Sequence, residues 1–436
     1  MRSNFIFTAL GSLAFILPPA MAQTSQFKTD ETYYAKYKPL EAPAPGQTRL
    51  EVGDRVAICG DSITEQRKYS RIMETYLTVC QPQLNLTVRQ YGWSGEKASG
   101  FLQRMTNDCL RFKPTVATTC YGMNDHEYKA YEERIGKSYR ENMGGVVDAF
   151  KANGVRVLLG SAGSVGKKPT WVGDPKATIE DMNLSLCELR NLDIQLAKEK
   201  QVGFADIFWP MLTAGHKMSE KYGENFPVSG KDGVHPDWAG HLVMAYEFLH
   251  AFGVNGNIAT LTVDMKSGKA TLSEGHELIS FDGEDLKIKS TRYPFCVGYG
   301  DVTKDNNLRA GTTLVPFYQE LNQFRLVLTH ANPGNYSIVW GRGSHNFKAE
   351  ELEKGVNLAE VFPVNPFTEA FNQVDAAVAK KQEFETRQIQ QIFHGDEGKA
   401  DMEAAVKKTE AEREPLEAAI KAAFVPVTHT VRIAFE

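Results

Sequence analysis

The stretch RVAICGDS, residues 55–62, decides the fold of this chain. Its first five residues form an apolar, β-rich run, and a helix-like pattern follows the serine. A strand that leads through a tight turn into a helix is typical of a parallel α/β sheet. The turn puts the Ser62 hydroxyl at the carboxyl end of a buried strand, where open α/β sheets bind their ligands. Alone, Gly60-Asp61-Ser62 is also an ordinary turn with a helix cap, so its meaning depends on the rest of the chain.

Four further β-rich runs alternate with helical patterns along residues 55–252. They lie at 86–91, 115–120, 155–159 and 202–206. Between them, apolar residues recur at intervals of three and four, as is typical of helices that bury one face. These stripes run over 69–80, 139–150, 179–196 and 238–249. Because strands that alternate with helices pair in parallel, we predict an α/β domain with a five-stranded parallel sheet over residues 51–255.

The pattern of the chain changes after residue 255. Short alternating runs at 258–263, 277–281, 286–290, 324–329, 336–340 and 427–435 are typical of antiparallel strands. Charged, helix-forming sequence interrupts them at about 368–424 and is itself broken at 394–398. We predict a β-rich, sandwich-like accessory domain over residues 256–436 that carries an inserted helical hairpin.

The first 22 residues have the pattern of a secretory signal peptide. Arg2 precedes an apolar stretch at 5–17, and the small residues of Ala20-Met21-Ala22 supply a cleavage site after Ala22. This pattern predicts a secreted or periplasmic protein. A buried N-terminal helix is the alternative. Residues 23–50 are polar and proline-rich, which favours a loosely packed leader.

The composition excludes two classes of partner. The net charge is -5 over 436 residues, and no segment concentrates Lys and Arg into the basic face that nucleic acids require. Beyond the signal peptide, no stretch is apolar over the length needed to span a bilayer. The remaining composition, 42% hydrophobic and 24% charged, is typical of a globular protein.

Six cysteines remain after cleavage at Ala22, and none forms a Cys-x-x-Cys pair that would indicate a zinc or redox site. An exported chain with an even number of cysteines suggests disulfides. Cys59 and Cys120 end strands that we expect to be neighbours, and Cys80 and Cys109 lie on flanking helices, which gives two candidate pairings. Buried free thiols are the alternative.

Four segments at predicted strand ends and before the last helix supply the groups that acyl transfer needs. The reaction requires a nucleophilic hydroxyl, a base, an acid that orients the base, and donors for the oxyanion. Ser62 supplies the hydroxyl, and Asp232 and His235, three residues apart, supply the acid and the base. The backbone N–H groups of Ser62 and Gly92 and the side-chain amide of Asn124 are the predicted oxyanion donors. Each segment alone is also typical of a turn or a cap, and their joint occurrence favours catalysis.

The same segments, in the same order, resemble the SGNH subgroup of the GDSL hydrolases. The matching blocks are Gly60-Asp61-Ser62-Ile63-Thr64, Gly92, Gly122-Met123-Asn124-Asp125 and Asp232-Gly233-Val234-His235, with isoleucine in place of the leucine of the family name. The resemblance covers about residues 50–255. It implies a three-layer α/β/α fold of the flavodoxin-like type, the catalytic and oxyanion roles given above, and no metal or cofactor.

Residues beside these segments are candidate substrate contacts. Trp93 either stacks on a sugar ring or packs against the protein. Tyr121, His126 and Glu127 flank Asn124 and either line the substrate cleft or are ordinary loop residues.

We expect a secreted serine esterase that hydrolyses acyl esters through an acyl-enzyme, with acetyl esters of a carbohydrate as the favoured substrate. Two alternatives keep the same triad. One is a glycan O-acetyltransferase, and the other is a lipase or acylhydrolase, although the long apolar lid of an interfacial lipase is not evident. An alternative of another class is a non-catalytic glycan-binding scaffold in which the β domain binds.

Overall fold

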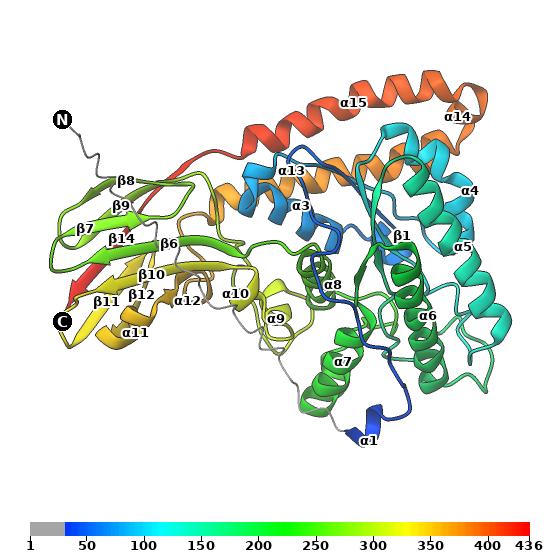
Figure 1. Ribbon diagram of the computed structural model, residues 1–436, viewed down its shortest axis with the longest axis horizontal. Helices are drawn as coiled ribbons and strands as arrows, with labels where there is room; N and C mark the ends of the chain where they lie inside the picture. Colours follow the sequence, from blue (N-terminus) through cyan, green and yellow to red (C-terminus); the bar gives the residue numbers. More distant parts are fainter. Residues whose placement is uncertain (1–30) are drawn as a thin grey trace, which may run out of the picture.

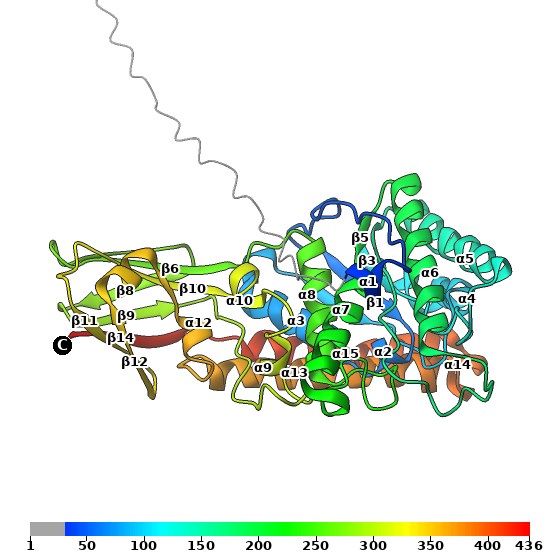
Figure 2. The same ribbon diagram turned by 90° about the horizontal axis from the view of Figure 1, so that it is seen from below.

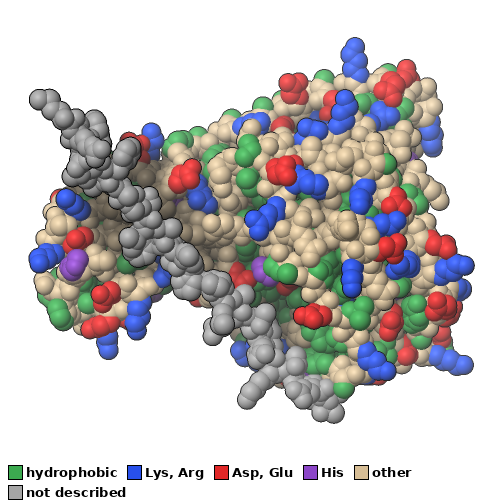
Figure 3. All heavy atoms as spheres, in the orientation of Figure 1, with side chains coloured by type: hydrophobic (Ala, Val, Ile, Leu, Met, Phe, Trp, Pro, Cys, Tyr) green, Lys and Arg blue, Asp and Glu red, His purple; other side chains and the backbone are tan. Residues whose placement is uncertain are grey.

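The computed structural model describes residues 31–436, so the predicted signal peptide, 1–22, lies outside the described residues. The described chain has an α/β part at one end and a β-rich part at the other (Figures 1 and 2). Two long helices, α13 (Thr368–Arg387) and α15 (Met402–Ala423), run along one side of the molecule from one part to the other. Figure 3 shows acidic and basic side chains interspersed over the face that it draws.

The α/β part contains the predicted five-stranded parallel sheet. Its strands are β1 (Arg55–Gly60), β2 (Thr87–Gln90), β3 (Val116–Cys120), β4 (Arg156–Gly160) and β5 (Gly203–Ala205). All neighbours pair in parallel in the order β2-β1-β3-β4-β5, which is the flavodoxin-like order that the family resemblance implies. The carboxyl ends of β1, β3 and β4 therefore meet at one edge of the sheet.

Helices cover both faces of this sheet. They are α1 (Glu31–Tyr34), α2 (Ser62–Glu65), α3 (Tyr69–Cys80), α4 (Ala98–Asp108), α5 (Glu133–Ala152), α6 (Ile179–Lys200), α7 (Phe208–Tyr222) and α8 (Trp238–Ala251). Alternate residues of β1 point into two separate apolar clusters. Ile58 packs in the cluster that contains α3 and α8, whereas Ala57 packs in the one that contains α4 and α5. The three-layer prediction is confirmed.

The β-rich part contains two sheets. Their strands are β6 (Asn257–Asp264), β7 (Lys269–Leu272), β8 (His276–Phe281), β9 (Asp285–Ser290), β10 (Gln323–Thr329), β11 (Asn335–Trp340), β12 (Gly343–Lys348), β13 (Val356–Asn357) and β14 (Val427–Phe435). The orders are β13-β10-β6-β7 and β12-β11-β14-β9-β8. The prediction of purely antiparallel strands is wrong at one pair, because β10 lies parallel to β6. A long connection that holds the short helices α9 (Leu308–Gly311) and α10 (Phe317–Glu320) returns the chain to the start of β6.

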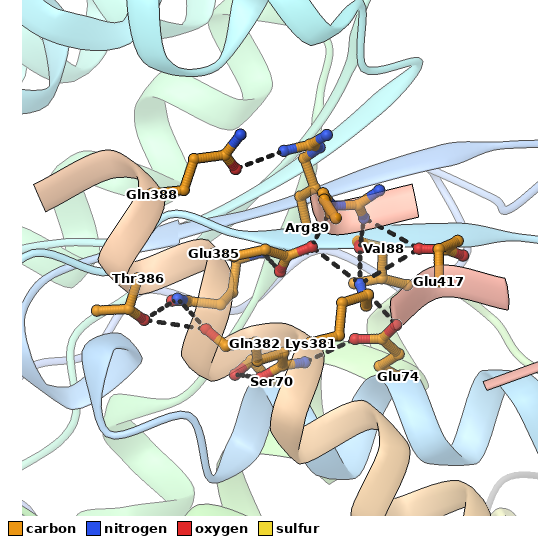
Figure 4. A network of polar contacts seen from close by, with 12 residues as sticks. Ser70, Glu74, Val88, Arg89, Lys381, Gln382, Glu385, Thr386, Gln388 and Glu417 are labelled. Atoms are coloured by element: carbon orange, nitrogen blue, oxygen red, sulfur yellow. Dashed lines mark hydrogen bonds and ion pairs between the residues drawn. The ribbon is translucent and has the colours of Figure 1, made fainter. Parts of the chain in front are cut away.

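The predicted helical hairpin exists, but it packs against the α/β part. It consists of α13, a π-helical turn at Gln388–Phe393, α14 (Asp396–Ala400) and α15, and the short helices α11 (Ala349–Lys354) and α12 (Leu358–Val361) precede it. Helix α13 contacts α3 and the edge strand β2. Two hairpin side chains, Lys381 and Arg413, donate to the backbone carbonyl of Val88 on β2, so the hairpin covers the open edge of the parallel sheet (Figure 4).

The described part of the leader is packed rather than loose. Tyr34 and Tyr37 are buried, and their rings contact Trp209 of α7. The Leu40 N–H donates to the Asn191 side chain on α6 at 2.9 Å. Aromatic anchors therefore hold this polar, proline-rich segment against the α/β part.

All six cysteines are buried free thiols, so neither candidate disulfide is present. Strands β1 and β3 are neighbours as expected, with Gly60 opposite Cys120. This register offsets Cys59 from Cys120 by one residue, and the two side chains point into different apolar clusters. Cys80 and Cys109 likewise belong to different clusters.

Within residues 31–436, none of the helices combines the length and apolar character of a membrane-spanning segment.

Candidate active site

The structure brings Ser62, His235 and Asp232 into one chain of hydrogen bonds. Ser62 begins α2 directly after β1, and its Oγ lies 2.8 Å from His235 Nε2. His235 Nδ1 lies 2.7 Å from Asp232 Oδ2. The His235 side chain is 25% exposed and that of Asp232 is 38% exposed, so the site is open to solvent. A hydroxyl, an imidazole and a carboxylate in this geometry form an activated nucleophile.

Hydrogen bonds to the Asp232 carboxylate hold the loop that carries the acid and the base. Asp232 Oδ1 accepts the backbone N–H groups of Val234 and His235, each at 2.9 Å. Partial burial raises the pKa of Asp232, but these two donors and the His235 side chain outweigh burial and lower that pKa overall. Asp232 therefore stays ionised, accepts a hydrogen bond from the Nδ1–H group of His235 and leaves Nε2 free to accept one from Ser62.

Asp61 is the helix cap that the turn pattern of Gly60-Asp61-Ser62 suggests. Its Oδ1 accepts the Ile63 N–H at 2.9 Å and so caps the short helix α2. Burial raises the pKa of Asp61 to about 7, and the nearby carboxyl groups of Asp125 and Glu96 add to the effect. The side chain supports the turn beneath Ser62 and makes no contact with the triad.

Two of the predicted oxyanion donors are available. The Ser62 N–H has no hydrogen-bond partner among the described residues, as expected for the first residue of a helix. The Asn124 amide is oriented at both ends, because its Nδ2 donates to the Glu96 carbonyl at 3.1 Å and its Oδ1 accepts from the Tyr128 hydroxyl at 3.2 Å. The second Nδ2 hydrogen remains for a ligand.

The predicted use of the Gly92 N–H has to be corrected. This group donates to Gln90 Oε1 at 2.9 Å. Glycine is needed at position 92 for packing, because a Cβ atom there would lie 2.2 Å from the Glu65 backbone nitrogen. Three residues further along the same loop, Gly95 is exposed, has a φ of 72°, and its N–H has no hydrogen-bond partner within the described chain. Exposed backbone N–H groups without a partner among residues 31–436 therefore lie at Ser94 and Gly95 of this loop, beyond Gly92.

The four predicted substrate contacts do not line the site. Trp93 packs against His394 of the hairpin, at 4.8 Å between ring centroids, and against the Arg104 guanidinium. Tyr121 is buried and donates to Glu96, and His126 is buried with its pKa lowered by burial to about 4. Glu127 forms a surface ion cluster, and hydrogen bonds from Arg134 contribute most to lowering its pKa to about 2.

Two aromatic residues beside the triad are absent from the sequence-based prediction. The Trp171 ring is 50% exposed, and its centroid lies 6.0 Å from that of His235. Tyr128 meets Trp171 edge to face at 5.9 Å. Tyr128 follows β3 and Trp171 follows β4, so their places after strand ends were the available signal. Glu127 and Tyr128 both have positive φ, 56° and 54°, which is strained backbone next to a functional site.

No cluster of three or more His, Cys, Asp or Glu side chains within residues 31–436 is arranged to hold a metal ion.

Comparison with known proteins identifies a family for the α/β part. A model of the GDSL-like lipase/acylhydrolase family matches residues 58–243. No curated protein matches the sequence. The solved structure of a gut microbial diltiazem-metabolizing enzyme is 20% identical, with a TM-score of 0.71 over 90% of this chain and 100% of that chain. An acetylxylan esterase from Geobacillus stearothermophilus is also 20% identical, with a TM-score of 0.38 over 48% of this chain and 97% of that chain.

The likeness to the diltiazem-metabolizing enzyme shows that the fold of both parts occurs together in another protein. The family match covers the segment that contains Ser62, Asn124, Asp232 and His235. Residues 58–243 therefore belong to the GDSL-like lipase/acylhydrolase family, and the protein is an ester-hydrolysing enzyme.

Proposed function

We propose that the protein is an exported serine esterase that removes acyl groups, foremost acetyl, from a carbohydrate. The observation that carries the proposal is the hydrogen-bonded chain from Ser62 Oγ through His235 to Asp232, in a domain of an acylhydrolase family. Export is inferred from the signal-peptide pattern of residues 1–22. The open triad and the exposed aromatic ring beside it support a polar, bulky substrate over a lipid chain.

In the first half of the reaction, Ser62 Oγ attacks the ester carbonyl while its proton moves to His235 Nε2. The carbonyl oxygen becomes an oxyanion, and the Ser62 N–H and the Asn124 amide donate to it. The intermediate then collapses. The bond to the alcohol oxygen breaks, His235 Nε2 returns the proton to that oxygen, and the acyl group remains on Ser62.

In the second half, water takes the place of the alcohol. His235 accepts a proton from the water as its oxygen attacks the acyl-enzyme, the same donors hold the second oxyanion, and Ser62 leaves with the proton from His235. Asp232 remains ionised throughout and stabilises the imidazolium that forms twice in each cycle.

Replacing Asn124 with alanine is expected to lower kcat by about 100- to 1,000-fold, the usual effect of removing one oxyanion donor. The substrate KM is expected to change little, because the amide donates mainly to charge that develops in the transition state. Steady-state kinetics on an aryl acetate measure both values. Asn142→Ala is the matched control, because the Asn142 amide lies on the exposed side of α5 and donates to Ser138. Equal kcat in the two variants would remove Asn124 from the oxyanion hole.

The substrate class is tested by the products that the enzyme releases. We expect acetate from acetylated xylan or pectin, and a steep fall in turnover as the acyl chain of simple aryl esters lengthens. Activity confined to long-chain lipid esters would contradict the carbohydrate proposal. Transfer of acetyl to an added glycan in preference to water would identify a transferase.

A further inference from the structure

The loop after β4, residues 161–178, is fastened to the catalytic loop and to α6. The Gly166 N–H donates to the Gly233 carbonyl at 2.9 Å. Gly233 has a φ of 87°, and a Cβ atom there would lie 2.1 Å from the Lys167 carbonyl oxygen. On the other side, the Asn183 amide bonds the backbone N–H and carbonyl of Val165, both at 2.8 Å. The loop that carries Trp171 is therefore positioned relative to His235 by backbone contacts.

Trp171 is unusual among the five tryptophans of the chain. It is 50% exposed, whereas the other four are buried or partly buried. Its ring has the edge of Tyr128 on one side and the imidazole of His235 beside it. A large apolar ring that remains exposed at a reactive centre is available for a ligand.

The chemistry of the triad identifies which half of the ester meets this ring. His235 Nε2 delivers the proton to the departing alcohol oxygen, so that oxygen must lie next to the imidazole when the bond breaks. The acyl carbonyl points the other way, toward the donors of Ser62 and Asn124. A group beside His235 on the Trp171 side is therefore attached to the alcohol and not to the acyl chain.

We propose that Trp171 is the platform on which the alcohol half of the substrate stacks, and that this half is a sugar ring. The apolar C–H face of a sugar packs on the indole while its hydroxyls stay in water. Trp171 then discriminates between leaving groups, and it does not discriminate between acyl chains of different length. This inference rests on the proposed esterase function and adds the position of the glycan to it.

The test compares esters that share the acetyl group and differ in the alcohol. For Trp171→Ala, kcat/KM on acetylated xylo-oligosaccharides is expected to fall about tenfold, mainly through KM, since one aromatic contact is lost. Ethyl acetate has no ring to stack and is expected to change less than about twofold. Trp171→Phe is expected to recover most of the loss. Tyr299→Ala is the matched control, because Tyr299 is also an exposed aromatic residue, at 74%, and lies in the β-rich part.

Three results would overturn the proposal. They are an equal fall on both substrates, no fall on either, and a loss that varies with acyl length across ethyl acetate, propionate and butyrate. A selective fall on phenyl acetate without one on the acetylated sugar would replace the sugar with an aromatic alcohol. Failure of the esterase function itself is distinct, because the wild type would then hydrolyse none of these esters, or its turnover would survive in Ser62→Ala.

Discussion

Replacing Ser62 with alanine is expected to lower kcat for ester hydrolysis by about 10⁴- to 10⁶-fold. The variant has no oxygen to attack the carbonyl and no acyl-enzyme to form. What remains is the rate that the oxyanion donors and substrate binding supply to a water molecule. The loss is expected to appear in kcat, with little change in the affinity for substrate, and initial rates on an aryl acetate measure it.

The control for this variant is Ser138→Ala, at an exposed position of α5, which is expected to keep full activity. Labelling by an alkylphosphonate ester provides an independent readout, since the probe bonds to the nucleophilic oxygen. Wild type and Ser138→Ala are expected to react, and Ser62→Ala is not. Wild-type turnover in a correctly folded Ser62→Ala protein would refute the mechanism, and absence of labelling in the wild type would favour the non-catalytic scaffold.

Replacing Lys381 with methionine is expected to lower the free energy of unfolding by about 3–5 kcal/mol, the usual cost of breaking a buried ion pair. The Lys381 side chain is completely buried, and its Nζ lies 2.9 Å from Glu74 Oε1 and 3.0 Å from Glu385 Oε1 (Figure 4). Burial lowers the pKa of Lys381, but these carboxylates outweigh burial and raise it overall. Methionine fills the same space without a charge, so Glu74 loses its cation, whereas Glu385 keeps its pair with Arg413 at 2.8 Å. Urea unfolding measures the difference.

Two further measurements separate this cause from a general packing defect. Lys408→Met, which removes an exposed pair with Glu397 on the same hairpin, is expected to leave the unfolding free energy essentially unchanged. The penalty in Lys381→Met is also expected to grow with pH. Burial already raises the folded-state pKa of Glu74 to about 7, and without Lys381 its charged form is still less favourable. Glu74 is largely neutral below its wild-type pKa in both proteins, so the additional loss of stability in the variant appears as the pH rises through about 7. A penalty that is equal at pH 5 and pH 8 would contradict this explanation.

The triad could be predicted because residues close to one another in the sequence carry its signals. The Asp232-to-His235 spacing places both side chains on one loop, and the end of β1 places Ser62 at the ligand-binding edge of a parallel sheet. The parallel pairing follows from the alternation of strands and helices, whereas the strand order is what the family resemblance implies. These features depend on neighbouring residues and on chain topology, both of which are visible in the sequence.

The errors concern contacts made over long sequence separations. Gly92 has the expected place after β2, but its N–H is taken by Gln90, whose own amide donates to Thr386 and to the Gln382 carbonyl of the hairpin. Gln90 is only two residues from Gly92, but the hairpin residues that hold its side chain lie almost 300 residues away, and nothing near residue 92 indicates them. Trp171 was missed because an isolated tryptophan in a loop has no periodicity to mark it.

The hairpin was predicted from its helical, charged sequence, but its docking was not. Charged helix faces usually lie in solvent, so Lys381, Glu385 and Arg413 gave no indication that they would be buried against β2. Their pairing with Glu74 and with the Val88 carbonyl requires the assembled sheet. Burial of a charge depends on its partner, and the partner here lies about 300 residues away.

Because Lys381 covers the edge strand β2, the α/β sheet cannot be completed until the hairpin has been synthesised. The hydrogen bond from Lys381 to the Val88 carbonyl joins residues 293 positions apart. At about 5–20 residues per second, a ribosome needs roughly 15 to 60 seconds to make that intervening chain. A sheet that formed before the hairpin was made would have β2 as an uncovered edge strand, the kind of surface that chaperones shield and other chains pair with. Completion of this sheet therefore waits for synthesis of nearly the whole polypeptide.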